Sequence, residues 1–374
     1  MLRLDLRKTT VLTALFACAF ALLLLPAAGA DGKTRTLAPK KGKVYFGVTD
    51  TGETSGFFDF AEAVGKKPAV IQTFHPWGNS LKKALPRWRE VRARPMLHIT
   101  TKDDYGTELI TPLQIANGLG DDYLIRLNRS LSENRVLTYI RPMGEPNRCK
   151  NPYAGVDCAG NIRGGSYSFE YYKSAFRRIA IITRGGGKRK KINRKLRAIG
   201  LPKIQLAGEA KAKGAKLPDT LPAAPVSIIW SPLPAGSPTV RHNFPGKYWP
   251  GREWADWVAT DFYSKYTNWK HLKRFYVKWA EGQKKPMALT EWGVWDYDAP
   301  KFTKRIFGFV GKRPRMKMMV YYQDFGTSNP FRIQNFPLSL NVIRNRLQSP
   351  VFPRNAPRPP EDRPKITVPG VIPQ

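Results

Sequence analysis

The sequence predicts a single α/β domain of the TIM (β/α)8-barrel class, and two observations favour that fold class. Eight short apolar runs recur along the chain with helical patterns between most of them, as expected for a parallel sheet. No glycine-rich phosphate-binding turn follows the first run, which disfavours the runner-up, an open doubly wound sheet. The length after residue 30, about 345 residues, suits one barrel, although two smaller domains would also fit.

The eight runs are the expected strands of the barrel, which we assign to residues 44–349. In chain order, the expected strands span 44–48, 69–74, 95–99, 136–140, 226–230, 257–260, 287–290 and 317–321. Helices are expected over 57–64, 81–91, 121–133 and 169–182. In the last of these, apolar residues repeat with the helical period of about 3.6 residues. Residues 184–225, rich in Gly, Lys and Pro, break the alternation and are interpreted as an insertion.

Both ends of the chain lie outside the expected barrel. Residues 1–30 have a basic start, an apolar run over 11–25 and a small-residue cleavage site at Ala28-Gly29-Ala30, the pattern of a secretory signal peptide. The apolar run is shorter than the ~20 residues of a membrane helix, so an uncleaved anchor is the weaker alternative. A basic leader, 31–43, follows, and eight prolines in 350–374 predict an extended tether. We expect a secreted protein, extracellular or cell-wall associated, with no membrane span after cleavage.

The cysteines fit an oxidising compartment. Cys18 lies in the expected signal peptide, so the mature chain would keep Cys149 and Cys158. Their proximity in the sequence predicts a disulfide, with two free thiols as the alternative. The loop between them begins shortly after Glu145, so the bridge would stiffen one wall of any site that this glutamate serves.

The formal net charge of +35 is extreme, and it bears on the partners of the protein. A basic balance is typical of nucleic-acid-binding proteins. Here the excess is spread along the chain, and its one dense cluster, 188–197, falls in the expected insertion. The preferred interpretation is a basic surface that is merely solvated, and attraction to anionic cell-wall polymers or acidic glycans is the alternative. We expect a monomer and no nucleic-acid partner.

Two glutamates at strand ends are the candidate catalytic residues. Glu145 follows the fourth expected strand, and Glu291 ends the seventh. Because the C-terminal ends of barrel strands share one rim, both carboxylates should reach the same mouth. Glycoside hydrolysis needs such a pair, about 5–5.5 Å apart for retention of configuration or about 6.5–9.5 Å apart for inversion. The aspartates that compete for these roles are Asp50, Asp256, Asp261 and Asp324.

The histidines and cysteines do not suggest another chemistry. His75 and His98 fall near the second and third strands and could reach the mouth, where His75 is a candidate substrate-binding residue. A lone histidine is also commonly a hydrogen-bonded structural residue. The sequence contains no Cys/His cluster and no Gly-x-Ser-x-Gly elbow, so we expect no metal, no cofactor and no serine nucleophile.

Five ordered segments between Tyr45 and Leu347 resemble glycoside hydrolase family 26, the β-mannanase family, whose (β/α)8 barrel carries glutamates on strands four and seven. The segments are Arg141-Pro142-x-x-Glu145-x-Asn147; Ser168-Phe169-x-x-Tyr172-x-x-Ala175-Phe176-Arg177-Arg178; Trp230-Ser231-Pro232; Trp249-Pro250-Gly251 with Trp257-Val258 and Asp261-x-Tyr263; and Lys285-Pro286 before Thr290-Glu291-Trp292-Gly293. Each segment alone is weakly specific. Five in order, with sensible spacing, are more specific, and they cover most of the mature chain.

The resemblance implies a role for each matching residue. Glu145 would be the general acid/base and Glu291 the nucleophile of a retaining reaction, and Tyr263 would hydrogen-bond the nucleophile. The residues that would line the sugar-binding site are Asn147, Trp230 and Trp292. For Trp230, packing in the barrel core is the alternative. The implied substrate is a polysaccharide, cleaved as by an endo-β-mannanase.

Three positions depart from the family pattern. Gly144 stands where the family has His before the acid/base, and Leu233 stands where strand five usually continues with Asn. The Cys149–Cys158 loop replaces an aromatic-rich segment. These changes bear on the sugar more than on the carboxylate pair. The sequence thus predicts a secreted retaining β-glycoside hydrolase, and the alternative is a non-catalytic glycan- or wall-binding protein on a degenerate barrel.

Overall fold

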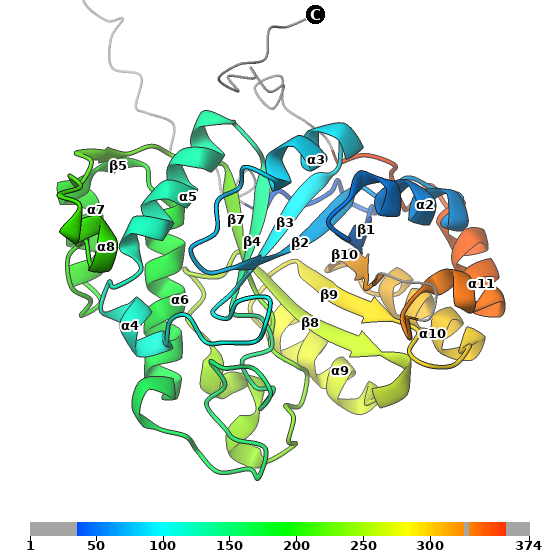
Figure 1. The fold of residues 1–374 in the computed structure, drawn as a ribbon. Helices are drawn as coiled ribbons and strands as arrows, with labels where there is room; N and C mark the ends of the chain where they lie inside the picture. The colour runs from blue at the N-terminus through cyan, green and yellow to red at the C-terminus, as the bar shows by residue number, and fades with distance from the viewer. Residues whose placement is uncertain (1–35, 325–328, 357–374) are drawn as a thin grey trace, which may run out of the picture.

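The computed structural model describes residues 36–324 and 329–356, and a closed barrel of parallel strands lies at its centre (Figure 1). The barrel strands are β1 (Tyr45–Thr49), β2 (Val70–Pro76), β3 (Arg94–Thr100), β4 (Thr138–Pro142), β7 (Val226–Trp230), β8 (Trp257–Tyr263), β9 (Met287–Gly293) and β10 (Met316–Tyr321). They follow this order around the barrel, and β10 pairs with β1. The prediction of a TIM (β/α)8 barrel is confirmed. The expected signal peptide and the tail from residue 357 onward lie outside the described residues.

Helices cover the outer face of the barrel, because the apolar outer side of each strand needs a packing partner. The helices are α2 (Thr54–Val64), α3 (Ala84–Val91), α4 (Pro112–Ala116), α5 (Asp121–Glu133), α6 (Phe169–Arg184), α7 (Arg189–Arg197), α8 (Gly208–Ala212), α9 (Trp269–Phe275), α10 (Pro300–Gly311) and α11 (Pro337–Leu347). A small antiparallel pair, β5 (Gly187–Lys188) and β6 (Thr220–Leu221), flanks α7. No helix within the described ranges is long and apolar enough to cross a membrane.

Side chains of the barrel strands alternate between two cores, since successive residues of a strand point to opposite faces. The inner core fills the barrel and includes Tyr139, Ile229 and Trp257. The outer core lies between the strands and the helices and includes Ile140 and Trp230. This alternation decides which strand residues can reach the mouth of the barrel.

The N-terminal end of the barrel, its floor, is closed by the segment just before β1. The backbone carbonyl of Leu37 accepts hydrogen bonds from Arg94 Nη1 at 2.9 Å and from the Tyr139 hydroxyl at 2.6 Å. The Arg94 guanidinium also lies over the rings of Tyr45 and Tyr139, 5.6 and 5.7 Å from their centroids. The end of the expected basic leader is therefore packed into the barrel floor.

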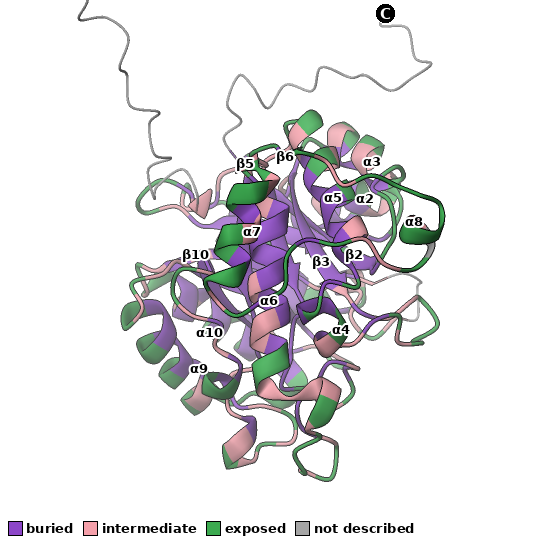
Figure 2. Cartoon of the chain, turned by 90° about the vertical axis from the view of Figure 1, so that its left-hand side faces the viewer, coloured by how far each residue is buried: buried purple, intermediate pink, exposed green. Residues whose placement is uncertain are grey.

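The segment between α6 and β7 is folded and packs on the outside of the barrel, where Figure 2 shows α7 in front of α6. Ile192 and Leu196 of α7 are buried and belong to the outer core. Arg178, buried in α6, pairs with Asp121 of α5 and donates to the carbonyl of Pro202 at 2.9 Å. The region interpreted as an insertion thus has two helices, α7 and α8, and a strand pair, and it is anchored to the buried Arg178 of α6.

Candidate active site

A pocket of about 1150 Å³ opens where the C-terminal ends of the barrel strands meet. Glu145, Asp261 and Glu291 line the pocket, and one carboxylate oxygen of each lies within 4.8 Å of the other two. They come from the loop after β4, from β8 and from β9. The structure thus brings together the two glutamates nominated from the sequence and adds Asp261 as a third carboxylate.

A register shift in β9 turns Glu291 toward the pocket. Ala288 belongs to the inner core, so strict alternation would point Trp292 inward and Glu291 outward. The pairing of β9 with β8 shifts after Thr260, which leaves Thr290 as an extra residue in β9. Such a β-bulge reverses the alternation beyond it. Glu291 therefore faces the mouth, and Trp292 joins the outer core.

Arg141, near the end of β4, links two of the carboxylates. Its side chain is fully buried; Nη1 donates to Glu291, Nη2 donates to Asp261, and Nε donates to Ser231 Oγ at 2.6 Å. Burial lowers the pKa of Arg141, but the surrounding carboxylates outweigh burial, so the pKa stands above its ordinary value. A permanent positive charge is therefore built into the mouth of the barrel.

Asp261 lies deeper than the glutamates and holds Arg141 in place. Its side chain is fully buried, and Thr290 Oγ1 donates to its Oδ1 at 2.7 Å. Burial raises the pKa of Asp261 well above its ordinary value, against the opposing charge of Arg141. Because its Oδ2 accepts from the guanidinium, Asp261 acts on the site through Arg141.

The backbone next to Glu145 leaves room for the Arg141 guanidinium. Met143 and Glu145 have φ angles of 46° and 51°, in a region that residues with side chains seldom adopt. A Cβ atom at Gly144 would lie 2.7 Å from Arg141 Nε, closer than two such atoms can pack. The family departure at Gly144 therefore has a local reason: a side chain there would collide with the cation that organises the site.

His98 of β3 reaches the same place and contacts protein groups there. Its Nε2 accepts from the Gly144 N–H at 3.2 Å, and its Nδ1 lies 3.3 Å from Arg141 Nη1 and 3.9 Å from Glu291 Oε1. Burial, followed by the charge of Arg141, lowers the pKa of His98 well below its ordinary value. The imidazole therefore stays neutral and can accept the hydrogen bond from Gly144.

Tyr263 and Gln72 complete the contacts of Glu291. The Tyr263 hydroxyl donates to Oε2 at 2.7 Å, and Gln72 Nε2 donates to Oε1 at 3.4 Å. Burial, followed by the charge of Glu291, raises the pKa of Tyr263 well above its ordinary value, so the phenol stays a donor. Both oxygens of Glu291 thus face hydrogen-bond donors, as an ionised carboxylate requires.

Glu145 is paired with Arg148 on the same loop. Arg148 Nη1 lies 3.1 Å from Glu145 Oε2, and the Arg148 side chain is 44% exposed. The charge of Glu145 raises the pKa of Arg148. Asn151 Nδ2 donates to the backbone carbonyl of Glu145 at 2.9 Å and fixes the loop. The two glutamates therefore differ, because Glu291 is held by buried groups and Glu145 by a cation that is partly in solvent.

Two tryptophans expected to line the sugar site lie in the outer core instead. Trp230 packs against Trp249 with ring centroids 4.8 Å apart, and Trp292 packs against Tyr321 at 5.1 Å. Neither indole has exposed surface, so neither can stack on a sugar ring. Strand alternation explains Trp230, whose neighbour Ile229 points inward, and the β-bulge explains Trp292.

Asn147 and His75 also make structural contacts in place of the expected substrate contacts. Asn147 is fully buried, and its side chain accepts from the Leu233 N–H at 2.7 Å and donates to the Leu233 carbonyl at 2.9 Å. His75 stacks on Tyr123 of α5, and its Nε2 lies 2.9 Å from the carbonyl of Asn79. Burial lowers the pKa of His75. Neither side chain is part of the pocket wall.

Other aromatic residues line the pocket. They are Phe74, Tyr153, Phe262, Tyr263, Tyr266, Trp295, Tyr322 and Phe331. Phe74 directly precedes His75 in β2, but its side chain points to the inside of the barrel whereas that of His75 points outward. Phe74 is 39% exposed. The alternation of β2, in which Val70 belongs to the inner core, is the signal that could have identified it. Exposed flat rings of this kind can pack against the apolar faces of a ligand.

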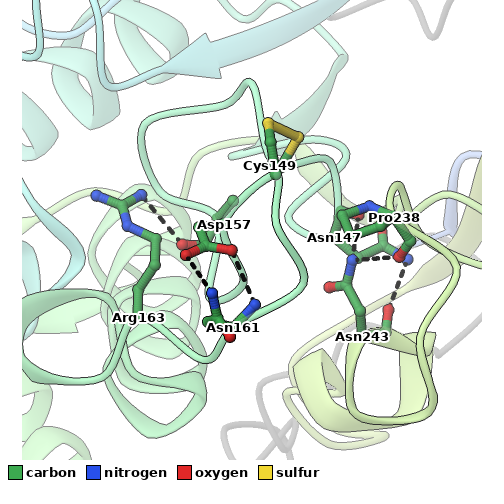
Figure 3. Close-up of a disulfide and its surroundings, with 9 residues drawn as sticks. Asn147, Cys149, Asp157, Asn161, Arg163, Pro238 and Asn243 are labelled. Atoms are coloured by element: carbon green, nitrogen blue, oxygen red, sulfur yellow. Dashed lines mark hydrogen bonds between the residues drawn. A yellow bond between two sulfur atoms is a disulfide. The ribbon is translucent and has the colours of Figure 1, made fainter.

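A disulfide stiffens the loop after β4 (Figure 3). Cys149 and Cys158 are bonded, with Cα atoms 5.0 Å apart, as the sequence predicts. Beside the bridge, Asn243 Nδ2 donates to the carbonyls of Asn147 and Pro238, each at 2.9 Å. The loops after β4 and β7, which form one wall of the pocket, are therefore joined to each other.

The three carboxylates also have the spacing of a metal site. Among the described residues, one oxygen each from Glu145, Asp261 and Glu291 lies close enough to the others to ligate a single cation. Arg141 already places its guanidinium against Asp261 and Glu291. The positive charge that a metal would bring is supplied there by the protein itself, so the donor set fits an ion-paired site better than a metal centre.

The barrel is similar in structure to β-mannanases of glycoside hydrolase family 26. No protein-family model and no curated protein matches the chain in sequence. A family 26 β-mannanase from Bacteroides ovatus matches with a TM-score of 0.53 and 14% identity, covering 86% of this chain and 92% of that one. A mannanase from Bacillus subtilis matches at 0.51 and 16% identity, covering 87% and 91%. A family 26 protein from a Muricauda species matches at 0.50 and 18% identity, covering 85% and 92%. The resemblance to family 26 is thus confirmed as a likeness of fold over most of the chain.

Proposed function

We propose that the protein is a retaining β-glycoside hydrolase, with Glu145 as the general acid/base and Glu291 as the nucleophile. The proposal rests on one observation: the two carboxylates meet in one pocket, with oxygens within 4.8 Å of each other. Retaining enzymes place their carboxyl groups about 5–5.5 Å apart, whereas inverting enzymes need about 6.5–9.5 Å to admit a water molecule. The short separation therefore supports retention.

Each glutamate has surroundings that suit its proposed role. Glu291 is held by Arg141, Tyr263 and Gln72, so an ionised oxygen is oriented toward the anomeric carbon that it would attack. Glu145 would protonate the glycosidic oxygen and then act as the base for the water that releases the glycosyl-enzyme. For the acid step, the proton lies either on Glu145 Oε1 or on Oε2, and in the second case Arg148 has to give up its contact with that oxygen.

The proposed substrate is a polysaccharide, with β-mannan as the first one to test. The likeness of the barrel to family 26 β-mannanases supports this class of substrate. The aromatic residues of the pocket wall support it independently, because pyranose rings pack their apolar faces on flat side chains. The pocket opens at the barrel mouth, where the loops after the strands meet.

We also propose that the protein is exported. Support comes from the signal-peptide pattern of residues 1–30 and from the Cys149–Cys158 disulfide, because such bonds persist in oxidising compartments. N-terminal sequencing of protein collected outside the producing cells should find a chain that begins at Asp31. Full-length chain retained inside the cells would contradict export.

The catalytic test is the release of reducing sugar from β-mannan, β-glucan and xylan. We expect the wild type to act on at least one of them and Glu291→Gln and Glu145→Gln to lose about 10³-fold or more of that activity. Glu170→Gln, at a carboxylate whose side chain is 78% exposed on α6, is the control and should keep full activity. The first product seen by NMR should keep the anomeric configuration of the substrate. Turnover that is indifferent to both glutamates would refute the proposal.

A glycan-binding barrel without turnover is the second candidate. The observation that favours it is the ion pair between Arg148 and Glu145, which places a cation against the carboxylate that would carry the catalytic proton. A pair that persists when the polysaccharide binds would oppose protonation of Glu145 and so disfavour its role as an acid. Binding of β-mannan that is equal for the wild type and Glu291→Gln, with no sugar released by either, would establish this candidate over the enzyme.

A further inference from the structure

A second concave site lies on the outside of the molecule, on the segment between α6 and β7. It is a groove of about 630 Å³, and we call it the basic groove because its lining includes Lys188, Arg189, Lys190, Arg197 and Lys203. Its lining and that of the catalytic pocket have no residue in common. In Figure 1, α7 and β5 lie at the left edge of the molecule, outside α6, and Figure 2 views this face directly.

The segment around the basic groove concentrates positive charge far beyond its share of the chain. Residues 184–225 contain twelve Lys and Arg and two acidic residues, so they carry +10 of the +35 formal charge. Within α7, Ile192 and Leu196 are buried, and the basic side chains occupy the remaining positions with Asn193. The helix therefore uses its apolar residues for packing and presents cations to solvent.

This arrangement costs stability in the protein alone. The first turn of α7 contains Arg189, Lys190 and Lys191 and no acidic residue, although a helix N-terminus disfavours positive charge. Lys190 and Arg194 stand four positions apart, where like charges repel across one turn. The basic residues of the last turn, Arg194, Lys195 and Arg197, suit the helix C-terminus, so the unfavourable charge is concentrated in the first turn, beside the groove. Broken local rules of this kind are expected at functional sites. An anionic ligand would offset that charge.

We propose that the basic groove binds an acidic polysaccharide, one that bears carboxylates on its sugars, at a site separate from the catalytic pocket. The groove already holds one carboxylate, since Asp219 lies 3.4 Å from Arg189 while its own side chain is 96% exposed. So exposed an ion pair is weak, and a ligand carboxylate can replace Asp219. The N–H of Arg189 donates to the Asp219 carbonyl at 2.7 Å, so this amide is not available to cradle a phosphate at the helix end.

Nucleic acid is the competing polyanion, and the segment lacks the aromatic side chains on which single-stranded bases stack. Residues 184–225 contain no Phe, Trp, Tyr or His. Single-stranded nucleic acids are held by aromatic rings that stack on the bases, together with cations along the backbone. A groove that has cationic side chains and no aromatic ones fits a polysaccharide whose sugars bear carboxylates. This inference does not depend on the catalytic roles of Glu145 and Glu291.

The test compares two triple variants of the whole mature chain for binding to polygalacturonate. Lys188→Gln/Lys190→Gln/Arg197→Gln removes three charges from the basic groove. Lys270→Gln/Lys301→Gln/Lys304→Gln removes three exposed charges from α9 and α10 and is the matched control. We expect the groove triple to lose about tenfold or more in affinity and to show a shallower salt dependence, because fewer counterions are released. The control should change by less than about twofold.

Each other result is decisive. Equal losses in the two triples would mean attraction by net charge alone and would overturn the proposal. Duplex DNA that binds as tightly as polygalacturonate, with the same sensitivity to the groove triple, would assign the groove to nucleic acid and would overturn it too. Unchanged melting temperatures show that both triples are folded. Hydrolysis of neutral β-mannan reports on the catalytic pocket, so its absence would refute the proposed enzyme without affecting the groove.

Discussion

Two buried arginines mark the two ends of the same barrel, and they differ in what surrounds them. At the floor, Arg94 contacts the Leu37 carbonyl and two tyrosine rings. At the mouth, Arg141 is held by the carboxylates of Asp261 and Glu291. At the floor the arginine joins the segment before β1 to the barrel, whereas at the mouth the arginine sets the charge of the candidate site. Packing contacts thus lie at one end of the barrel and the candidate site at the other, where this fold generally places its active site.

The backbone does not follow the same division, because positive φ angles occur at both ends: at Leu37 and Arg92 near the floor, and at Met143 and Glu145 at the mouth. The bulge at Thr290 also lies at the mouth. A residue in a sparsely populated conformation costs about 1–3 kcal/mol and persists only where its surroundings fix it. At the mouth, the contacts of Arg141 and the disulfide loop provide that support.

Removing the mouth arginine should have the largest effect on stability. Arg141→Met leaves Asp261 and Glu291 buried without their cation, so we expect a loss of about 3–5 kcal/mol in the free energy of unfolding. Any hydrolysis of β-mannan should disappear as well, because Glu291 loses its main anchor. Urea unfolding and reducing-sugar release measure the two effects. A variant as stable as the wild type would show that the pair contributes nothing.

Filling the space beside the mouth arginine should have a smaller effect. In Gly144→Ala the new methyl group meets the Arg141 guanidinium, so we expect a loss of about 1–3 kcal/mol and a lower kcat. Gly308→Ala in α10 is the control, because a Cβ there meets nothing within 4 Å. The control should be neutral or more stable by up to about 1 kcal/mol. Equal unfolding curves for the two variants would refute the crowding at Gly144.

Removing the floor arginine should affect stability alone. In Arg94→Met the Leu37 carbonyl keeps the hydroxyl of Tyr139, so we expect a loss of about 1–2 kcal/mol. Activity on β-mannan, measured at saturating and at low substrate, should stay within about twofold of the wild type. A change in kcat or KM as large as that of Arg141→Met would break the division between floor and mouth.

The pH dependence of stability should report on His98. Its pKa in the folded chain is well below the ordinary 6.5, so below that pH the unfolded chain takes up a proton that the folded chain does not. Stability should therefore fall as the pH drops below 6.5, by up to about 1.4 kcal/mol per pH unit. His98→Gln keeps an acceptor for Gly144 and should show a shallower fall between pH 7 and 5, measured by urea unfolding. His75 and His271, whose pKa values are also lowered, act in the same direction, whereas Asp261 and Asp121, whose pKa values burial raises, act in the opposite direction.

Much of the fold and the central pair of the site followed from local patterns. The apolar run 226–230 coincides with β7, and the helical period predicted 169–182 within α6. Glu145 and Glu291 were paired because parallel strands of a barrel end at one rim, a rule that needs only the positions of the strands. The disulfide followed from the proximity of two cysteines in an expected secreted chain.

Side-chain direction did not follow from the same patterns. Phe74 and His75 are neighbours, and a sequence alone does not show which of them faces the inside of the barrel. Trp230 was expected at the sugar site, but its direction in β7 is set by Ile229 packing inside. For Trp292, a β-bulge at Thr290 reverses the alternation, and the residue types near Thr290 do not predict this bulge. An error of one residue in alternation moves a side chain from the pocket to the outer core.

Local sequence patterns predict the strands, the helices and the positions of the strand-end carboxylates, because each depends on residues a few positions apart. The charge network of the mouth does not follow from such patterns, because Arg141 meets Asp261 and Glu291 across separations of 120 and 150 residues. Only closure of the barrel brings these strands together, and only the bulge in β9 points Glu291 at the guanidinium. The two glutamates of the site can therefore be identified from local sequence, whereas the electrostatics of the site depend on the closed barrel.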